Sequence, residues 1–316
     1  FGPDGKDPLD FHNPEHSERV SKLSREFLEI VRGVDPALVS DRDVAFVELE
    51  GLAHDLVQEA TVGGGTMRKR HRGAAIGNER ASAERLLQEL GRYVDEEGNP
   101  VFPLDGPVSP NDPETLYEAA VQDIGATYPD FAFGAALPDG TKGLKVHQPH
   151  LVPQGSLRAL ALATADLRGA VGASDFSAFQ REGDAEFREL QEPIKEELRG
   201  GVATIPAERR AKIAASILDW EKTQEGFAKW QQALFEESLA ANEILRRSEK
   251  REEILAALRQ RYGHFDDNIA AAQRRAEGLE AKFGFLREPD AQQKLIGEKN
   301  DAPFMSLLEE VGYVSL

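Results

Sequence analysis

The stretch GSLRALALATADLRGAV, residues Gly155–Val171, predicts a helix in the protein core. Small and apolar residues occupy nearly every side of the helix that it predicts, and helices of that kind lie inside a protein core. One carboxylate, Asp166, lies within this stretch. A buried carboxylate is costly unless a cation or hydrogen bonds compensate its charge, so the chain must supply a partner for Asp166.

Other helices are expected on both sides of this one. The pair Asn13-Pro14 is typical of an N-cap followed by the first residue of a helix. Apolar spacing and helix-end signals predict helices over residues 14–31, 40–58, 78–93, 113–127, 207–262 and 266–282. No strand alternation extends beyond a few residues. The expected fold class is all-α, with a helical core over residues 1–175 and a helical extension over 176–316 that packs against the core or mediates self-association.

Composition excludes several classes of protein. The chain has 316 residues, and its 38 Lys and Arg against 56 Asp and Glu give a net charge of −18, which opposes binding of duplex nucleic acid. The absence of cysteine excludes disulfides, thiolate nucleophiles and thiolate metal sites. No stretch approaches the roughly 20 apolar residues of a membrane span, and none reads as a signal peptide. The chain begins with Phe1 rather than Met, so we expect that an upstream segment was removed, and we expect a cytoplasmic location with no membrane partner.

Candidate metal ligands are spread over three of the expected helices. His16 lies in the first turn of the first helix, His54 and Asp55 are adjacent in an apolar part of the second, and Asp166 lies in the buried helix. One ion between these groups would satisfy them most simply, whereas a neighbouring arginine such as Arg158 or Arg168 could pair with Asp166 instead. Imidazole and carboxylate ligands suit a divalent ion such as Mn, Mg, Ni, Zn or Fe.

The order His, His-Asp, Asp resembles that of the HD-domain metal-dependent phosphohydrolases. The segment FHNPEH, Phe11–His16, is similar to the aromatic-His-Asn-x-x-His motif of the cyclic nucleotide phosphodiesterases and of several bacterial HD hydrolases. The segment NERASAERL, Asn78–Leu86, is similar to a helix start in small bacterial HD hydrolases. The resemblance covers residues 11–172 and does not reach the C-terminal region.

This resemblance implies a function and a role for each residue. It implies an HD-type core that uses a metal-activated water to hydrolyse a phosphate ester. A nucleotide or cyclic nucleotide is the expected substrate. The metal ligands that it implies are His16, His54, Asp55 and Asp166. It implies that His12 faces the substrate as the general acid, and an imidazole is suited to give a proton at neutral pH.

The segment TVGGGTMRKRHRGAAIG, residues 61–77, is a glycine-rich basic loop after the His-Asp pair. Its positive residues near the centre are Arg68, Lys69, Arg70 and Arg72. In a chain of negative net charge such a cluster can attract the phosphate of a small substrate, although a solvated surface turn is the other interpretation. His71 and Glu79 are candidates for a second ion or its waters.

Two other functions fit the same residues. Some HD-fold proteins hold two irons and activate oxygen, using extra histidines between the His-Asp pair and the last Asp. His71 with His147 or His150 could supply these. The third alternative is a non-catalytic HD scaffold that senses a nucleotide through the basic loop and signals through its helical C-terminal half.

Overall fold

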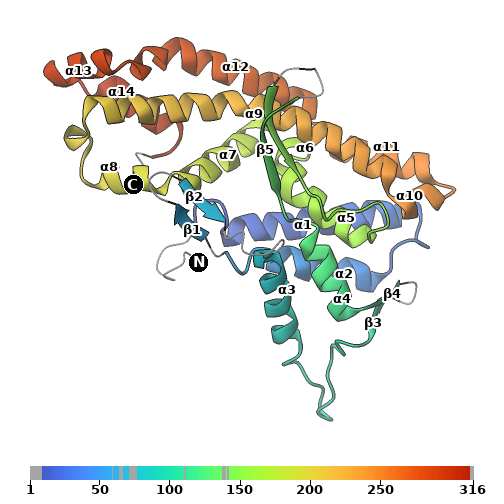
Figure 1. The fold of residues 1–316 in the computed structure, drawn as a ribbon. Coiled ribbons are helices and arrows are strands. Elements are labelled where there is room, and N and C mark those ends of the chain that lie inside the picture. Colours follow the sequence, from blue (N-terminus) through green and yellow to red (C-terminus); the bar gives the residue numbers. More distant parts are fainter. Residues whose placement is uncertain are drawn as a thin grey trace.

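The computed structural model describes residues 9–58, 60–63, 67–70, 77–109, 112–136, 140 and 142–313. Helices dominate this part of the chain, and its short strands form separate two-stranded hairpins. The prediction of an all-α fold is confirmed. Figure 1 shows a lower group of helices around α1 and an upper group along α9. None of the helices in the described ranges combines the length and apolar character needed to cross a bilayer.

The elements follow one another along the chain in three sets. The first helices are α1 (Pro14–Val34), α2 (Asp41–Ala53), α3 (Gly77–Leu90), α4 (Leu116–Gly125), α5 (Leu157–Ala163), the π turn η1 (Thr164–Arg168) and α6 (Gly169–Gly172). The hairpins join β1 (Ala60–Gly63) to β2 (Met67–Arg70), β3 (Pro107–Ser109) to β4 (Asp112–Thr115), and β5 (Asp130–Ala136) to β6 (Lys142–His147). The later helices are α7 (Phe176–Leu190), α8 (Glu192–Arg199), η2 (Val202–Thr204), α9 (Ala207–Ala241), α10 (Glu243–Arg247), α11 (Arg251–Arg261), α12 (Phe265–Phe283), η3 (Gly284–Arg287), α13 (Pro289–Gly297) and α14 (Ala302–Glu310).

The hairpins were not expected, because the sequence shows no strand alternation longer than a few residues. All are antiparallel, and β5 and β6 pair with a register shift between Phe133 and Ala135. Strands this short do not produce an alternation that can be distinguished from that of a loop, which is why the sequence did not reveal them. The β5–β6 hairpin lies along α9 (Figure 1), where the Gln231 side chain donates a hydrogen bond to the Val146 carbonyl at 3.0 Å.

The first helix begins where the sequence predicted. Pro14 is its first residue, and the Asn13 side chain accepts a hydrogen bond from the His16 amide at 3.0 Å. This cap satisfies one of the amides that lack a partner at a helix start. His16 therefore lies in the first turn, and His12 lies before the helix.

The second helix ends earlier than expected, at Ala53 rather than near Gln58. Ser40 caps its start through a capping box with Asp43, as the expected first residue suggested. At its other end, Nδ1 of His54 donates to the Gly51 carbonyl at 2.8 Å. A side chain that occupies a carbonyl of the last turn helps to end a helix. His54 and Asp55 consequently lie in the turn that follows α2.

The helix expected over residues 207–262 is divided into α9, α10 and α11. The break between α9 and α10 falls at Asn242, whose side chain accepts hydrogen bonds from the amides of Ile244 and Leu245 at 3.1 Å. Asparagine is a preferred N-cap, so its amide starts a new helix in place of continuing the old one.

Two hydrophobic cores share the long helix α9. Its C-terminal half contributes Ala228 and Phe235 to a core with α1 residues such as Phe27. Its N-terminal half contributes Ile217 to a second core with residues such as Phe304 of α14. Helices from both sides of residue 175 therefore pack into the first core, and the division of the chain at that residue stays a prediction.

A close approach between α1 and α2 fixes the distance between their histidines. A Cβ atom on Gly51 would lie 2.4 Å from the Ser21 Cα, so only glycine fits there. The Ser21 hydroxyl also donates to the Glu48 carbonyl at 2.8 Å. The two helices thus pack backbone to backbone three residues before His54.

A buried charge cluster connects α2, α4 and α5. The Arg158 guanidinium donates to Asp123 at 2.8 Å and to Asp43 at 2.5 Å. Glu50 is completely buried and, as a carboxylate, finds no hydrogen-bond donor among the described residues, whereas the protonated side chain can donate to Asp123. Burial, followed by the charge of Asp123, raises the pKa of Glu50 well above 4.5 despite the opposing charge of Arg158.

The variant Glu50→Gln is expected to be more stable than the wild type at pH 8, by on the order of 1 kcal/mol. A raised pKa in the folded state means that the fold is most stable with Glu50 protonated. The cost of the buried charge to the free energy of unfolding therefore grows as the pH rises above about 4.5. The stability gap should therefore shrink at pH 5. Urea unfolding at both pH values tests this, with Glu48→Gln on the exposed side of α2 as the control. An equal gap at the two pH values would contradict the assignment.

Candidate metal centre

Three parts of the chain bring four side chains together. His16 comes from α1, His54 and Asp55 from the turn after α2, and Asp166 from the π turn after α5. One ligand atom from each of the four lies within 4.8 Å of the others. All four were predicted from the sequence as metal ligands.

The distances suit one ion in the middle. Nε2 of His54 lies 2.9 Å from an Asp55 oxygen and 3.6 Å from an Asp166 oxygen. Nε2 of His16 lies 3.3 Å and 3.5 Å from the same two oxygens. Ligand atoms about 2.1 Å from an ion lie about 3 Å apart when adjacent and about 4.2 Å apart when opposite. The group therefore needs only small movements to close around a divalent ion.

The hydrogen bonding of His54 also fits a metal ligand. Its Nδ1 donates to the Gly51 carbonyl, which leaves the lone pair on Nε2 in the neutral ring. Nε2 of His54 and Nε2 of His16 are both buried and make no hydrogen bond of normal geometry. The carboxylate oxygens of Asp55 and Asp166 face these nitrogens as ion pairs, and an ion at the centre would satisfy the nitrogens and the oxygens together.

The pKa values of His54 and of the two aspartates show that the two carboxylates favour a positive charge between them. Burial lowers the pKa of His54, but the charges of Asp55 and Asp166 outweigh it and raise that pKa to about 10. Burial raises the pKa of both carboxyls, yet the neighbouring histidines hold the pKa of Asp55 and of Asp166 below the usual range. Without a metal, a proton on His54 supplies the cation that the two carboxylates require.

Metal binding is therefore expected to release a proton. The ion must displace the proton of His54, so the affinity should rise about tenfold per pH unit between pH 6 and 8. Calorimetric titration with Mn²⁺ in two buffers of different ionisation enthalpy measures the number of protons released. An affinity that does not depend on pH would contradict the assignment of His54 as a ligand.

His12 lies beside the four ligands and is held by an acidic partner that the sequence analysis did not find. Its Nδ1 donates to Glu189 of α7 at 2.7 Å, and Glu189 also accepts from the backbone amides of Phe11 and His12 at 3.0 and 3.1 Å. Burial raises the pKa of Glu189, but the charge of His12 and these hydrogen bonds lower it to about 2. The ring centroids of His12 and His16 are 6.1 Å apart. Glu189 therefore orients His12 next to the candidate metal.

Arg19 is a second neighbour that the sequence did not indicate. One of its nitrogens donates to Nδ1 of His16 at 3.0 Å and lies 2.6 Å from Glu182 of α7. Because arginine has no acceptor, Nδ1 of His16 must accept in this arrangement, and the ring proton lies on Nε2. For Nε2 to bind an ion, this proton must move to Nδ1, and Arg19 must then turn away from Nδ1 and stay paired with Glu182. Thus α7 supports two residues of the site.

The alternative partners considered for Asp166 have other contacts. Arg158 pairs with Asp43 and Asp123. Arg168 donates to Gln148 and to the Ala163 carbonyl, and no carboxylate of the described residues forms an ion pair with it.

The remaining predicted residues are placed only in part. Glu79 is buried in the first turn of α3 and is not one of the four converging ligands. Arg68, Lys69 and Arg70 lie on β2, of which the structure describes the backbone alone, and β2 contacts α7. His71 and Arg72 lie outside the described residues. His147 and His150 are outside the group, with His147 3.7 Å from Asp130 and His150 against the ring of Tyr128.

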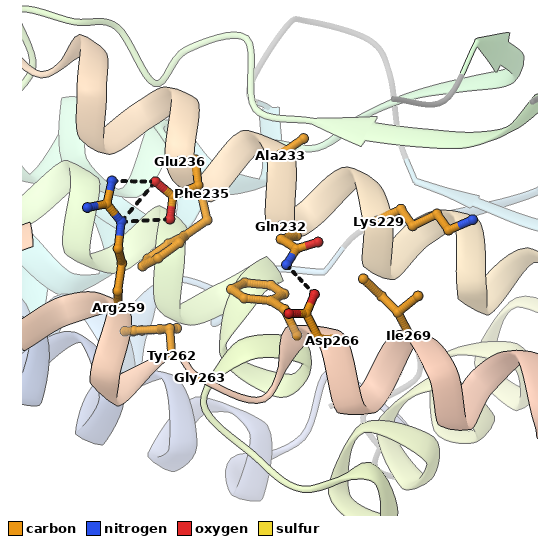
Figure 2. A pocket seen from close by; sticks show the side chains of 11 residues that line it. Lys229, Gln232, Ala233, Phe235, Glu236, Arg259, Tyr262, Gly263, Asp266 and Ile269 are labelled. Carbon is orange, nitrogen blue, oxygen red and sulfur yellow. Dashed lines mark hydrogen bonds and ion pairs between the residues drawn. The ribbon is translucent and has the colours of Figure 1, made fainter. Parts of the chain in front are cut away.

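A separate cavity of about 760 Å³ lies between α9 and the α11–α12 junction. Figure 2 shows that its polar side chains mainly face one another: Arg259 pairs with Glu236 at 2.7 Å, and Gln232 donates to Asp266 at 2.8 Å. None of its lining residues was predicted as a site residue. Its polar groups satisfy each other, which makes it a poorer candidate site than the four converging ligands.

Comparison with known proteins gives no family assignment. No protein-family model matches the chain, and no curated protein or solved structure matches it significantly. The interpretation of the site therefore depends on its own geometry.

Proposed function

We propose that the chain is a metal-dependent phosphohydrolase of the HD type, acting on the phosphate ester of a nucleotide or cyclic nucleotide. One observation carries the proposal: a buried His, His-Asp, Asp group converges beside a histidine that a carboxylate orients. A divalent ion held there would supply a water of lowered pKa and would polarise a phosphoryl oxygen.

The four ligands have distinct tasks in this mechanism. Asp55 and Asp166 supply two negative charges, which neutralise a divalent ion in a buried site. His54 is pre-oriented by the Gly51 carbonyl, so its Nε2 needs no reorganisation to bind. The described group offers four ligand atoms, fewer than the six that a divalent ion such as Mg²⁺ accepts, so water and substrate could bind the same ion.

His12 acts as the general acid. Its Nδ1 is engaged by Glu189, so the proton that it gives to the departing oxygen comes from Nε2. The negative charge of Glu189 favours the protonated imidazole, which is the form that a general acid needs. A proton at the leaving oxygen is most valuable for an ester whose leaving group is a poor one, such as a sugar hydroxyl.

The basic hairpin provides a source of positive charge near these groups. The strand β2 carries Arg68, Lys69 and Arg70 and contacts α7, the helix that supplies Glu189. In a chain with a net charge of −18, a local basic segment can attract an anionic substrate.

A substrate and metal screen tests the proposal. The purified protein is incubated with cyclic nucleotides, nucleoside mono- and triphosphates and bis(p-nitrophenyl) phosphate, each with Mn, Mg, Ni, Zn or Fe(II), and phosphate or monoester release is measured. Release that requires a metal and is absent from Asp55→Ala supports the proposal. Nucleotide binding without release would favour a sensor instead, and two irons per chain with oxygen consumption would favour an oxygenase.

A further inference from the structure

The helix that carries Asp166 is interrupted by a π turn. The segment runs from α5 through η1, Thr164–Arg168, into α6, and Asp166 is the middle residue of η1. A π turn holds an extra residue compared with an α-helical turn, is rare, and often occurs at functional sites. Because it disturbs the regular backbone hydrogen bonds, the surrounding side chains must hold it in place.

Two buried side chains close a hydrogen-bonded triangle around the start of this turn. The Gln148 amide nitrogen donates to the Ala163 carbonyl at 2.9 Å, and its oxygen accepts from Arg168 at 2.7 Å. The same Arg168 nitrogen also lies 3.2 Å from the Ala163 carbonyl as a donor. Gln148 is 6% exposed and Arg168 is 2% exposed. The Ala163 carbonyl thus receives two side-chain donors in place of regular helical bonding alone.

The triangle contains a charge that stability alone does not explain. The guanidinium of Arg168 is buried and is a cation at neutral pH, as arginine always is in proteins. Its contacts with Gln148 and Ala163 are to neutral groups, and its Nε is buried without a hydrogen bond. A buried guanidinium whose hydrogen bonds go only to neutral groups is costly, and costly arrangements of this type persist mainly where they hold a site in a required geometry.

We propose that Gln148 and Arg168 are positioning residues for Asp166. They hold the π turn in the register that puts an Asp166 oxygen 3.5 Å from Nε2 of His16 and 3.6 Å from Nε2 of His54. If the turn relaxes to a regular helix, residues from within the turn onward rotate about the axis, by up to about 100°. Asp166, in the middle of the turn, then points away from the ligand group. This inference rests on the metal centre of the proposed function.

The chain offers a matched control, a second buried glutamine that donates a hydrogen bond to the hairpin just before Gln148. Gln231 of α9 is also buried, and its amide donates to a carbonyl, that of Val146, at 3.0 Å. Val146 is two residues from Gln148 on the β5–β6 hairpin. Removing the Gln231 amide therefore weakens the hairpin to a similar extent without removing a hydrogen bond of the π turn.

The experiment compares Gln148→Met with Gln231→Met, because methionine preserves length and removes the amide. Affinity for Mn²⁺ is measured by calorimetry, and the Co²⁺ absorption spectrum reports the number of ligands. Circular dichroism and Tm confirm folding. We expect Gln148→Met to bind Mn²⁺ about 10- to 100-fold more weakly, with a changed Co²⁺ spectrum. Gln231→Met should lose a similar amount of Tm and keep the wild-type affinity and spectrum.

A second variant guards against loss of folding. Gln148→Glu keeps a partner for Arg168, as an ion pair, and removes only the donor to the Ala163 carbonyl, so it should fold and still bind Mn²⁺ more weakly. Wild-type affinity and spectrum in either folded Gln148 variant would overturn the positioning role. Equal losses in Gln148→Met and Gln231→Met would overturn it as well. If the wild type itself binds no Mn²⁺ or Co²⁺, the metal centre fails, and the inference fails with it.

Discussion

Asp55→Ala is expected to lose the bound metal and phosphate-ester hydrolysis together. The Asp55 carboxylate lies within 3.3 Å of both histidine Nε2 atoms, so its removal takes away a ligand and one of the two negative charges that balance a divalent ion. Loss of residues that merely orient ligands already lowers metal affinity about 10- to 100-fold, so loss of a ligand should cost at least about 100-fold. Turnover should fall to the background rate. Calorimetry with Mn²⁺ and an assay on the best ester of the screen measure the two effects.

An exposed aspartate on α2 provides the control for Asp55→Ala. Asp41→Ala removes a carboxylate from the start of the same helix, where its side chain is 98% exposed, and should retain affinity and activity. His54→Ala should behave as Asp55→Ala does, because it removes a ligand from the same turn. Turnover by purified, metal-stripped Asp55→Ala would show that the reaction does not depend on this centre.

The four converging residues were predictable because their signals are local. Asn13-Pro14 starts a helix by capping, which puts His16 in its first turn. Asp166 was recognisable as a carboxylate in a helix with no polar face. The burial of the His-Asp pair was inferred from its apolar neighbours, yet Leu52 and Leu56 are 43% and 52% exposed. The pair is buried by α1 and the π turn instead, so the expectation held for a different reason.

The supporting residues were not predictable from the sequence. Glu189 is 177 positions from His12, and nothing local in either segment indicates that they meet. Arg19 and Glu182 form an ordinary ion pair whose meaning depends on the contact with His16. The π turn also has no sequence signature. Its register is fixed by Gln148, which directly follows the β5–β6 hairpin, and that hairpin was itself missed. Tertiary contacts position these groups, whereas local sequence signals were enough to identify the ligands.

His12→Ala is expected to keep the metal and lose turnover, by about 10²- to 10⁴-fold on an ester with a sugar-hydroxyl leaving group. His12 is not one of the converging ligands, so Mn²⁺ affinity should remain near that of the wild type. On a p-nitrophenyl ester the loss should be much smaller, because that leaving group departs without a proton. A matched control is His264→Ala, which removes a histidine from the α11–α12 junction. Equal losses on the two kinds of ester would contradict a general-acid role.

Glu189→Gln tests the same role through its partner. The charge of His12 lowers the pKa of Glu189, and the charge of Glu189 stabilises the protonated His12 in return, since the coupling between two titrating groups is reciprocal. The glutamine keeps the side chain's size and an acceptor but removes the charge, so His12 should lose its proton at lower pH. The alkaline limb of the rate profile should therefore move to lower pH, while the rate at low pH and the Mn²⁺ affinity stay close to those of the wild type. A uniform loss of rate at every pH would mean that Glu189 serves only to hold the segment before α1, through its bonds to the amides of Phe11 and His12.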